Sequence, residues 1–492
     1  MVQDRRGIIL DLTRQLRRYE CDLLTIIAEA TNPKTGIGHL RFTIEAHSEK
    51  EVLNIWEELY KIENITEVII DAAATPARIC ENLEKIRAQH ATLSTKTIVE
   101  FKWDESVSML PPRTQVLMNP FDISRPPGEN MFFGRSEEIK IMQRELCEGE
   151  KGRALIMYGP RRSGKSSICK NFLEHHVHSP SWGVLFSLQN ARKQTEATIF
   201  MQLAEKVSST FHEQFQQSAP AWEDYNESEP QVRFKRILQE CITRIPGSRL
   251  VLALDEFGGA IESYERHILG FPFFNYWKEL MPEIPQLSLI FALPTSSHRT
   301  LSSKRFANVF SFAQPFQVTF LDTESAKQLL ADPLQDLQIA IHPNTVALAV
   351  TLTGGNPYYL TLIGQQIIYQ LNHDFHKQLV SDKDLNFVVE RFVEGGSYQN
   401  FNFLKSELQD KEEFVILETM VDFMSHSNQL EMQLKKIASL VGVPVATTRR
   451  YLDRMRHGLI LEENGPLSNP FYSFKIELVR RWLTRNRSFF TE

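Results

Sequence analysis

Short hydrophobic runs alternate with helical patterns through the middle of the chain. The runs cover residues 154–157, 184–188, 250–256 and 287–293. Between them, residues 198–215 and 232–245 carry hydrophobic side chains at helical spacing, which predicts amphipathic helices. A continuous apolar run is typical of a buried parallel strand, because helices cover both faces of such a sheet. The pattern therefore predicts an α/β core built on a parallel sheet over residues 119–315.

Residues 1–72 carry a different pattern, in which helical and alternating segments follow each other closely. We expect a helix over residues 7–19, strands over 23–30 and 40–44, a helix over 52–59 and a strand over 68–70. This order matches a ferredoxin-like βαββαβ unit of the α+β class that lacks its first strand. Residues 73–118 are interpreted as a linker with some order, because they hold a helical patch at 77–90 and a strand at 97–101.

The last part of the chain predicts a small helical domain with a β-hairpin. We expect helices over residues 414–420, 434–441 and 445–456, and strands over 458–462 and 472–476. Two helices joined by a turn and followed by two strands are typical of a winged helix. We therefore assign residues 405–492 to a winged-helix domain and residues 316–404 to a helical lid on the core.

The composition is that of an ordinary globular protein, and its 492 residues predict about three domains. A net charge of −6 provides no global attraction to nucleic acid, so DNA binding would need a local basic patch. The five cysteines are scattered and form no C-x-x-C pair, which favours a reducing cytoplasm. The apolar runs are short and the N-terminal residues hold no signal-peptide pattern, so we expect no membrane role.

The segment GPRRSGKS at Gly159–Ser166 matches the pattern G-x-x-x-x-G-K-[ST] at every fixed position. Gly159 and Gly164 let the backbone wrap a polyphosphate with its N–H groups pointing inward. Lys165 can reach the β- and γ-phosphates of ATP, and the Ser166 hydroxyl can bind Mg²⁺. The helix that starts here directs its positive end at the anion. The nucleotide-binding residues expected in this loop are Gly159, Pro160, Arg161, Arg162, Ser163, Gly164, Lys165, Ser166 and Ser167.

An acidic pair ends the apolar run that begins at Leu250. Asp255 is expected to hold Mg²⁺ through water, and Glu256 to polarise the attacking water for hydrolysis. Such a pair is common at the end of a strand, but after a phosphate-binding loop it indicates an ATPase. Lys165 and Glu256 are therefore the predicted catalytic residues, and Ser166 and Asp255 are the predicted Mg²⁺ ligands.

Two further motifs resemble those of STAND-class and archaeal-type ATPases, P-loop proteins related to the AAA+ group. FFGRSEE at residues 132–138 is similar to the h-h-G-R-x-x-E motif upstream of the phosphate loop. This resemblance implies that Gly134 and Arg135 lie near the base of the nucleotide. GGNPYYL at residues 354–360 resembles the STAND helical-lid motif, whose proline, here Pro357, approaches the nucleotide.

The same resemblance implies a polar sensor of the γ-phosphate directly after the last long apolar run. Thr295 is the predicted nucleotide-binding residue, and Ser296 is the alternative. Arg299 and Arg305 are further candidates for stabilising phosphate charge, although most arginines in such loops are solvated. The last helical segment resembles the closing helix of the family, so the resemblance spans residues 119–486.

The N-terminal pattern resembles the ACT regulatory domain, most closely the ACT domains appended to stringent-response alarmone synthetases. The segments that carry this resemblance are DRRGIILDL at residues 4–12, GHLRFTIEAH at 38–47 and NITEVIID at 64–71. It implies a small-molecule ligand, often an amino acid, and pairing of sheet edges between copies. A ferredoxin-like pairing module without a ligand is an equal alternative. Only residues 1–3 precede the motif, so the chain is a fragment, has a misassigned start, or borrows its first strand from a partner.

These features together predict a cytoplasmic STAND-type ATPase that acts as a regulatory switch, with ATP and Mg²⁺ as ligands and the ACT-like module as sensory or dimerising input. The alternative is a DNA-binding AAA+ ATPase that resembles archaeal origin-recognition proteins. The second helix of the winged helix carries Arg449, Arg450, Arg454 and Arg456. The acidic residues Asp453, Glu462 and Glu463 lie close to these arginines in the sequence and argue against DNA binding, so DNA is not the favoured partner. A metabolic kinase would need an acceptor pocket, for which the sequence shows no pattern.

Overall fold

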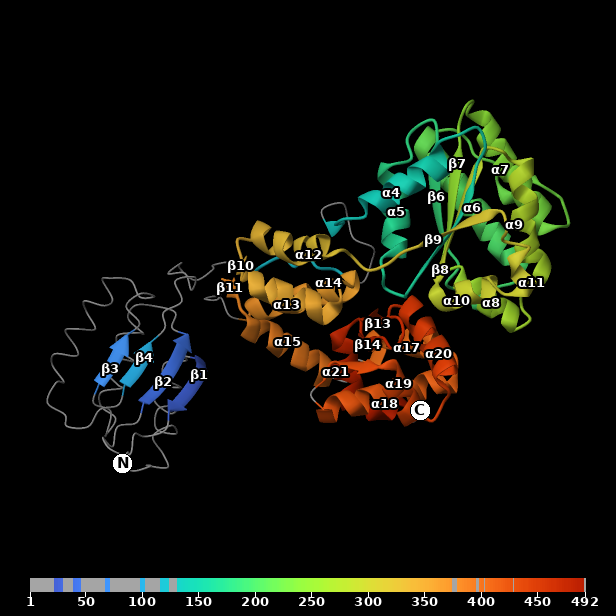
Figure 1. The fold of residues 1–492 in the computed structure, drawn as a ribbon. Coiled ribbons are helices and arrows are strands. Elements are labelled where there is room, and N and C mark those ends of the chain that lie inside the picture. The colour runs from blue at the N-terminus through green and yellow to red at the C-terminus, as the bar shows by residue number, and fades with distance from the viewer. Residues whose placement is uncertain are drawn as a thin grey trace. The chain divides into compact units, whose positions relative to one another are not determined.

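The computed structural model describes residues 22–29, 39–45, 67–70, 98–101, 116–123, 131–373, 378–394, 398–401, 403–427 and 429–490. The chain divides into two compact units (Figure 1). The first unit comprises residues 1–117, 338–341 and 370–380, and the second comprises the rest of the chain. The phosphate-binding loop belongs to the second unit.

A four-stranded sheet forms the N-terminal part of the first unit. Its strands are β1 (Asp22–Glu29), β2 (His39–Glu45), β3 (Glu67–Ile70) and β4 (Ile98–Phe101), in the order β1-β2-β4-β3. β1 and β2 form an antiparallel pair, whereas β4 runs parallel to both β2 and β3. The strands predicted over 23–30, 40–44 and 68–70 are confirmed. The linker predicted over 73–118 is corrected in part, because β4 lies inside the sheet and separates β2 from β3.

Several predictions for the N-terminal region lie outside the described residues. They are the helices expected at residues 7–19, 52–59 and 77–90 and the motif at residues 4–12. Elsewhere in the first unit, β10 (Ala340–Ile341) and β11 (Leu379–Val380) form a short parallel pair. The backbone N–H of Leu117 donates a hydrogen bond of 2.8 Å to the Asn372 side-chain oxygen within the same unit.

The second unit contains the predicted parallel sheet. Its strands are β5 (Ala154–Gly159), β6 (Trp182–Ser187), β7 (Leu250–Asp255), β8 (Leu287–Pro294) and β9 (Ala313–Gln317), in the order β6-β7-β8-β5-β9. All neighbouring pairs are parallel, so the α/β prediction is confirmed. β8 separates β5 from β7, and its Pro294 pairs with Gly159. The chain segments that follow β5, β7 and β8 therefore meet at the same edge of the sheet.

Alternate residues of each central strand face two different layers of helices. Leu155 and Met157 of β5 share a hydrophobic core with α4 (Ser136–Met142) and α5 (Lys165–His175). Ala154 and Ile156 belong to the larger core on the other face. The helices of that face include α6 (Glu196–Phe215), α7 (Pro230–Arg244), α8 (Gly258–Glu265) and α9 (Phe271–Glu283), as Figure 1 shows. Burial on both faces explains why these strands are hydrophobic throughout.

A group of helices follows β8, and β9 interrupts the group. They are α10 (Thr295–Leu301), α11 (Lys304–Ala307), α12 (Thr323–Asp336), α13 (Pro343–Thr353), α14 (Pro357–Leu371), α15 (Asp382–Glu394), α16 (Tyr398–Phe401) and α17 (Phe403–Glu407). The Asp322 carboxylate caps α12 by accepting hydrogen bonds from the backbone N–H groups of Glu324 and Ser325. Two predicted boundaries are corrected, because the break at 315/316 falls within β9 and the break at 404/405 falls within α17.

The C-terminal module consists of α18 (Lys411–Ser427), β12 (Glu431–Gln433), α19 (Leu434–Val441), α20 (Val445–His457), β13 (Leu461–Asn464), β14 (Phe471–Phe474) and α21 (Glu477–Arg485). Its strands form an antiparallel sheet in the order β12-β14-β13. Gly442, at φ 74°, ends α19 in a left-handed conformation and allows the tight turn into α20. The three helices and the second strand predicted here are confirmed, whereas the strand predicted over 458–462 begins only at Leu461, because residues 458–460 form the turn after α20.

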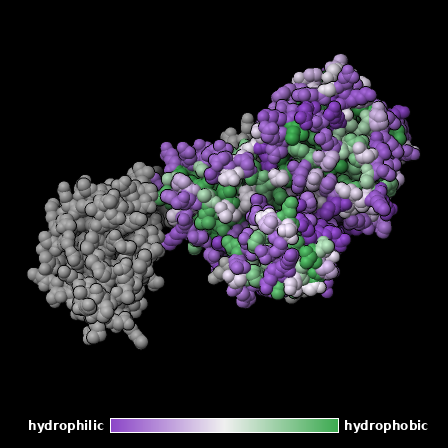
Figure 2. Space-filling view, in the orientation of Figure 1, coloured by the Kyte–Doolittle hydropathy of each residue, from purple (hydrophilic) through white to green (hydrophobic). Residues whose placement is uncertain are grey.

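The surface of the second unit is mostly hydrophilic in the view of Figure 2, with hydrophobic residues in smaller patches between. Among the described residues, no helix combines the length and the apolar character needed to cross a bilayer.

Candidate nucleotide-binding site

The phosphate-binding loop joins β5 to α5 at the edge where the strands end. Gly164, at φ 95°, adopts a left-handed backbone that glycine enters without strain. Gly159 has no room for a side chain, since a Cβ atom there would lie 2.3 Å from the Val318 carbonyl oxygen. The Lys165 ammonium donates hydrogen bonds of 2.9 and 2.8 Å to the carbonyl oxygens of Gly159 and Pro160. The loop is therefore closed around a buried positive charge.

The predicted Mg²⁺ ligands lie together beside this lysine. Burial raises the pKa of the Asp255 carboxyl group, while a hydrogen bond from the Ser166 hydroxyl opposes the rise. A hydroxyl and a carboxylate are oxygen ligands of the kind that Mg²⁺ prefers, with water and phosphate oxygens completing its shell. The part of the chain that the structure describes holds no group of three or more His, Cys, Asp or Glu residues suited to a metal. A cation at Ser166 and Asp255 would therefore depend on phosphate oxygens.

Glu256 follows Asp255 in an unusual backbone conformation, at φ 52°. Left-handed backbone is uncommon for a residue with a side chain and tends to occur at functional sites. The backbone N–H of Glu256 donates a hydrogen bond of 2.9 Å to the Asp255 carboxylate, which supports this turn. The side chain of Glu256 lines the cavity described below. The turn thus separates the two carboxylates, with Asp255 buried and Glu256 facing the cavity.

Thr295 starts α10 directly after β8, so the strand register places it beside the phosphate loop. Its side chain is buried, and its hydroxyl oxygen has no hydrogen-bond partner among the described residues. The Ser163 hydroxyl within the loop is also buried and has no hydrogen-bond partner among the described residues. Buried hydroxyl groups without partners carry a free-energy cost that a bound ligand can remove. Both are therefore suited to contact an anion that enters the loop.

Arg135 contacts the backbone of the phosphate loop. Its guanidinium donates hydrogen bonds of 2.9 Å to the Ser163 carbonyl oxygen and 3.0 Å to that of Thr319, and pairs with Glu138 at 2.8 Å. Gly134 packs against α12, where a Cβ atom would lie 2.5 Å from the Ser325 hydroxyl oxygen. The FFGRSEE motif therefore connects the loop to α12.

Arg162 joins the phosphate loop to the helices that follow the sheet. Its guanidinium lies 4.0 Å from the centre of the Tyr358 ring and donates a hydrogen bond to the Asn400 carbonyl oxygen. Tyr358 and Tyr359 also donate hydrogen bonds to Asn400, to its side-chain and backbone oxygens respectively. The two tyrosines of GGNPYYL thus hold α14, α16 and the loop together.

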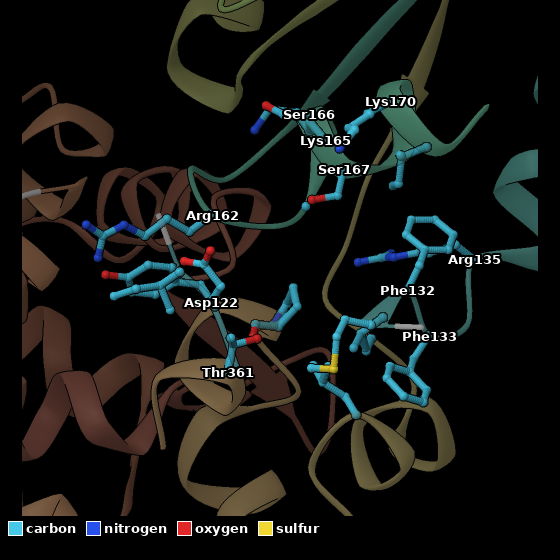
Figure 3. Close-up of a pocket in the computed structure, with 18 of the residues that line it drawn as sticks. Asp122, Phe132, Phe133, Arg135, Arg162, Lys165, Ser166, Ser167, Lys170 and Thr361 are labelled. Carbon is cyan, nitrogen blue, oxygen red and sulfur yellow. The ribbon is translucent and has the colours of Figure 1, made fainter. Parts of the chain in front are cut away.

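A cavity of about 710 Å³ opens beside the loop, and this volume lies within the range of small-molecule sites. Predicted residues that line it are Arg135, Arg161, Arg162, Gly164, Lys165, Ser166, Ser167, Glu256 and Pro357. The predicted residues Gly134, Gly159, Pro160, Ser163, Asp255 and Thr295 are not part of its lining. Figure 3 shows Lys165, Ser166 and Ser167 on one wall, and Phe132, Phe133 and Thr361 on others.

Other lining residues were missed by the sequence interpretation. They include Asn119, Asp122, Ile123, Phe132, Phe133, Lys170, Leu329, Tyr358 and Thr361. The two phenylalanines belong to a motif that had been noticed, so the apolar positions of FFGRSEE were the available signal. Tyr358 likewise belongs to GGNPYYL, whereas the others come from separate elements and carry no shared pattern. Apolar and aromatic side chains here form a surface suited to a flat ring, next to the polar phosphate loop.

The two arginines proposed after β8 differ in their surroundings. Arg305 lies over the Tyr264 ring at 5.1 Å, on the surface of the larger core. Arg299 points toward Glu407, with a nitrogen–oxygen distance of 3.8 Å between the side chains. Glu407 is a buried acid that the sequence interpretation did not single out.

This arrangement agrees with comparisons to known proteins. Residues 132–363 match a family described as an ATPase domain predominantly from Archaea. An uncharacterized ATP-binding protein of Methanocaldococcus jannaschii is 42% identical over 48 residues, which cover 80% of that protein and 10% of this chain. The chain belongs to this family of archaeal-type ATPases.

Solved structures share the fold of this archaeal-type ATPase. A Walker-type ATPase of Pyrococcus abyssi aligns over 74% of the chain and 99% of its own length, with 17% identity and a TM-score of 0.52. The ORC2 protein of Aeropyrum pernix, determined with ADPNP and ADP, aligns over 76% of the chain and 98% of its own length, with 13% identity and a TM-score of 0.53. These likenesses establish a common P-loop architecture.

Proposed function

We propose that this protein binds and hydrolyses ATP and acts as a regulatory switch of the STAND type. The observation that carries the proposal is the buried Lys165 ammonium, held in a closed phosphate loop at one wall of a nucleotide-sized cavity. Asp255 and Glu256 at the end of β7 and Ser166 at the start of α5 adjoin it. Few ligands other than a nucleoside polyphosphate fit a buried cation in a phosphate-binding loop beside an apolar wall.

Each group has a defined part in this proposal. Lys165 exchanges its carbonyl partners for the β- and γ-phosphate oxygens when ATP enters. Mg²⁺ bound by Ser166 and Asp255 would neutralise phosphate charge. Glu256 orients a water molecule toward the γ-phosphate and accepts its proton as the bond to the leaving oxygen breaks. Thr295 donates its unpaired hydroxyl to the γ-phosphate, which makes it the proposed sensor of that group.

Calorimetric titration of the full chain with ATP and Mg²⁺ tests the proposal directly. We expect binding with one nucleotide per chain, followed by slow release of phosphate. A chain that binds neither ATP nor ADP would overturn it.

We assign the C-terminal module to the winged-helix class, with α19 and α20 as its helix–turn–helix and β13 and β14 as its wing. The ion pairs of α20 argue against DNA as its partner. Arg449 pairs with Glu463 at 3.4 Å, Arg454 pairs with Asp410, and Arg456 lies 3.5 Å from Asp453. Arginines neutralised by carboxylates release few counterions from a phosphate backbone.

The full chain is therefore expected to bind duplex DNA only weakly, with a dissociation constant no tighter than about 1 µM at physiological salt. Fluorescence anisotropy with a labelled duplex at two salt concentrations measures this. Tight, salt-dependent binding that falls when Arg449 and Arg450 are replaced by alanine would instead support the DNA-binding alternative. Arg450 is the informative position, since among the described residues it forms no ion pair.

We propose that the N-terminal region is an ACT-like sensory or dimerising module. Within the described residues, β1 and β3 are the edge strands of its sheet. Unpaired strand edges tend to pair with other chains, and this tendency supports a role in self-association. A ligand-free pairing module fits these strands equally well. The three described cysteines, Cys147, Cys169 and Cys241, are free thiols, and we propose a cytoplasmic location on that basis.

Deleting residues 1–115 is expected to lower the oligomeric state while nucleotide binding persists, because the described residues that line the cavity all lie at Asn119 or beyond. Light scattering of both chains at about 50 µM, a concentration suited to weak interfaces, provides the comparison. If both the full chain and the deletion variant are monomers, the N-terminal region does not mediate self-association. Screening amino acids for a thermal shift that the deletion removes would then test the sensory role.

A further inference from the structure

A buried acid just before the C-terminal module lies close enough to the phosphate loop for its charge to act there. Glu407 ends α17, which packs against α10, the helix that begins with Thr295. The Glu407 side chain is 0% exposed. It is separated from the phosphate loop by more than 240 residues of sequence, yet its charge acts on Lys165.

The carboxylate of Glu407 has poor local partners. Neither of its oxygens forms a hydrogen bond of normal geometry among the described residues, although the Ser296 backbone N–H faces it and favours its charge. The Arg299 guanidinium lies 3.8 Å from it, whereas charge-assisted hydrogen bonds measure about 2.8 Å. Arg299 instead donates its 3.2 Å hydrogen bond to the Glu407 carbonyl oxygen. A buried acid in this state is costly unless nearby cations hold it.

The cations around Glu407 are the ones that a γ-phosphate needs. Burial raises the pKa of Glu407, whereas Lys165, Arg299 and Arg161 lower it by attraction. The Arg299 Nε and Nη1 atoms and the Arg161 Nε atom are buried without hydrogen-bond partners in the described part of the chain. The site therefore has unsatisfied donors and one anion loosely placed among them.

We propose that Glu407 discriminates between ATP and ADP because, when no γ-phosphate is bound, its carboxylate occupies the position of that group among these cations. This inference rests on the proposed ATP binding. Two anions at close range in a dry site repel strongly. The γ-phosphate of ATP therefore displaces Glu407 and takes over Lys165 and the free donors of Arg161 and Arg299. ADP lacks this group and leaves Glu407 in place.

The displacement links the nucleotide to the C-terminal module. α17 is followed after a few residues by α18, whose first turn is held by Glu413. Glu413 accepts hydrogen bonds of 2.7 and 3.3 Å from the backbone N–H groups of Gln409 and Asp410. Loss of the Glu407 attraction loosens α17 from α10, so the segment before α18 becomes more exposed when ATP is bound than when ADP is bound.

The test compares wild type with Glu407→Gln in the full chain, using ADP and a non-hydrolysable ATP analogue in calorimetry. Removing the charge lifts the repulsion, so we expect the analogue to bind about tenfold tighter while ADP affinity changes little. The control is Glu413→Gln, which neutralises a second buried acid, on the following helix α18, that is 1% exposed. The control should leave the ratio of the two affinities unchanged.

Three outcomes would overturn the inference. An unchanged affinity ratio in Glu407→Gln would limit Glu407 to a structural role. If Glu407→Gln weakened analogue binding only in the presence of Mg²⁺, Glu407 would be a ligand of the metal ion. If the variant lost hydrolysis while the ratio of analogue to ADP affinity stayed unchanged, Glu407 would be a catalytic base. If the wild type binds no nucleotide, the proposed function fails instead.

Hydrogen exchange provides a second, independent readout. In the wild type, amide exchange over residues 403–408 should increase with the ATP analogue and remain low with ADP. In Glu407→Gln this difference between the nucleotides should disappear. Thermal unfolding of the nucleotide-free variants shows whether both variants still fold. Equal exchange with both nucleotides in the wild type would contradict the proposed displacement.

Discussion

Replacing Lys165 by alanine is expected to weaken ATP binding by about 3–4 kcal/mol, or two to three powers of ten in the dissociation constant. The ammonium is the buried cation nearest the phosphate path, and its hydrogen bonds to Gly159 and Pro160 show that it reaches across the loop. Without it, the γ-phosphate meets the carboxylates of Glu256, Glu407 and Asp255, whose charges act on the Lys165 position, with less positive charge to offset them. Calorimetry with ATP and Mg²⁺ measures the loss.

Lys170→Ala is the matched control, because Lys170 lines the same cavity from the next turns of α5. It removes the same charge from the cavity wall without touching the loop, so ATP affinity should change little. The thermal unfolding temperature of Lys165→Ala reports whether the loop still folds. Equal ATP affinity in wild type and Lys165→Ala would contradict the assignment of the phosphate site.

Replacing Glu256 by glutamine should separate binding from hydrolysis. Glutamine keeps the size of the side chain and loses the charge that orients water and accepts its proton, so kcat should fall about a hundred- to a thousandfold. ATP affinity should stay near the wild-type value, because Glu256 does not bind the phosphates in the proposed mechanism. Single-turnover phosphate release at saturating ATP measures the chemical step without the contribution of product release.

Glu262→Gln is the control for this variant. Glu262 lies on the following helix, pairs with Arg192 at 2.7 Å, and lies 3.9 Å from Arg161 of the phosphate loop. Its loss removes a nearby negative charge without removing the proposed base, so kcat should change by less than about threefold. An unchanged kcat in Glu256→Gln would move the catalytic role to another carboxylate, and Glu407 would be the first to examine.

Features set by local sequence could be predicted well. The runs at β5, β7 and β8 are hydrophobic because helices cover both faces, and this pattern survives in the sequence alone. The phosphate loop could be identified residue by residue, because its glycines meet backbone constraints at fixed spacing. Gly159 faces the Val318 carbonyl oxygen and Gly164 takes a left-handed backbone. The backbone conformation of the loop is set within a few residues, so a spacing pattern records it, whereas the contact of Gly159 with Val318 is long-range and only the fold shows it.

Strand order and domain boundaries could not be predicted in the same way. The sequence does not state that β8 separates β5 from β7, although this order brings Thr295 to the loop. A buried strand has the same hydrophobic sequence pattern at any interior position of a sheet, so the pattern does not give the strand order. The pairing of β4 within the N-terminal sheet was missed for a related reason, since four residues carry too little pattern to choose their neighbours.

The sequence by itself determined the parallel α/β core, the phosphate loop, the acidic pair at 255–256 and the helices and strands of the C-terminal module. Only the tertiary structure decided that Arg162 is held by Tyr358 and Asn400, and that Glu407 lies among the cations of the site. The physical reason is the range of the interaction. Backbone conformation and burial periodicity are set by neighbours in the chain, whereas electrostatic contacts join residues hundreds of positions apart that only the folded core brings together.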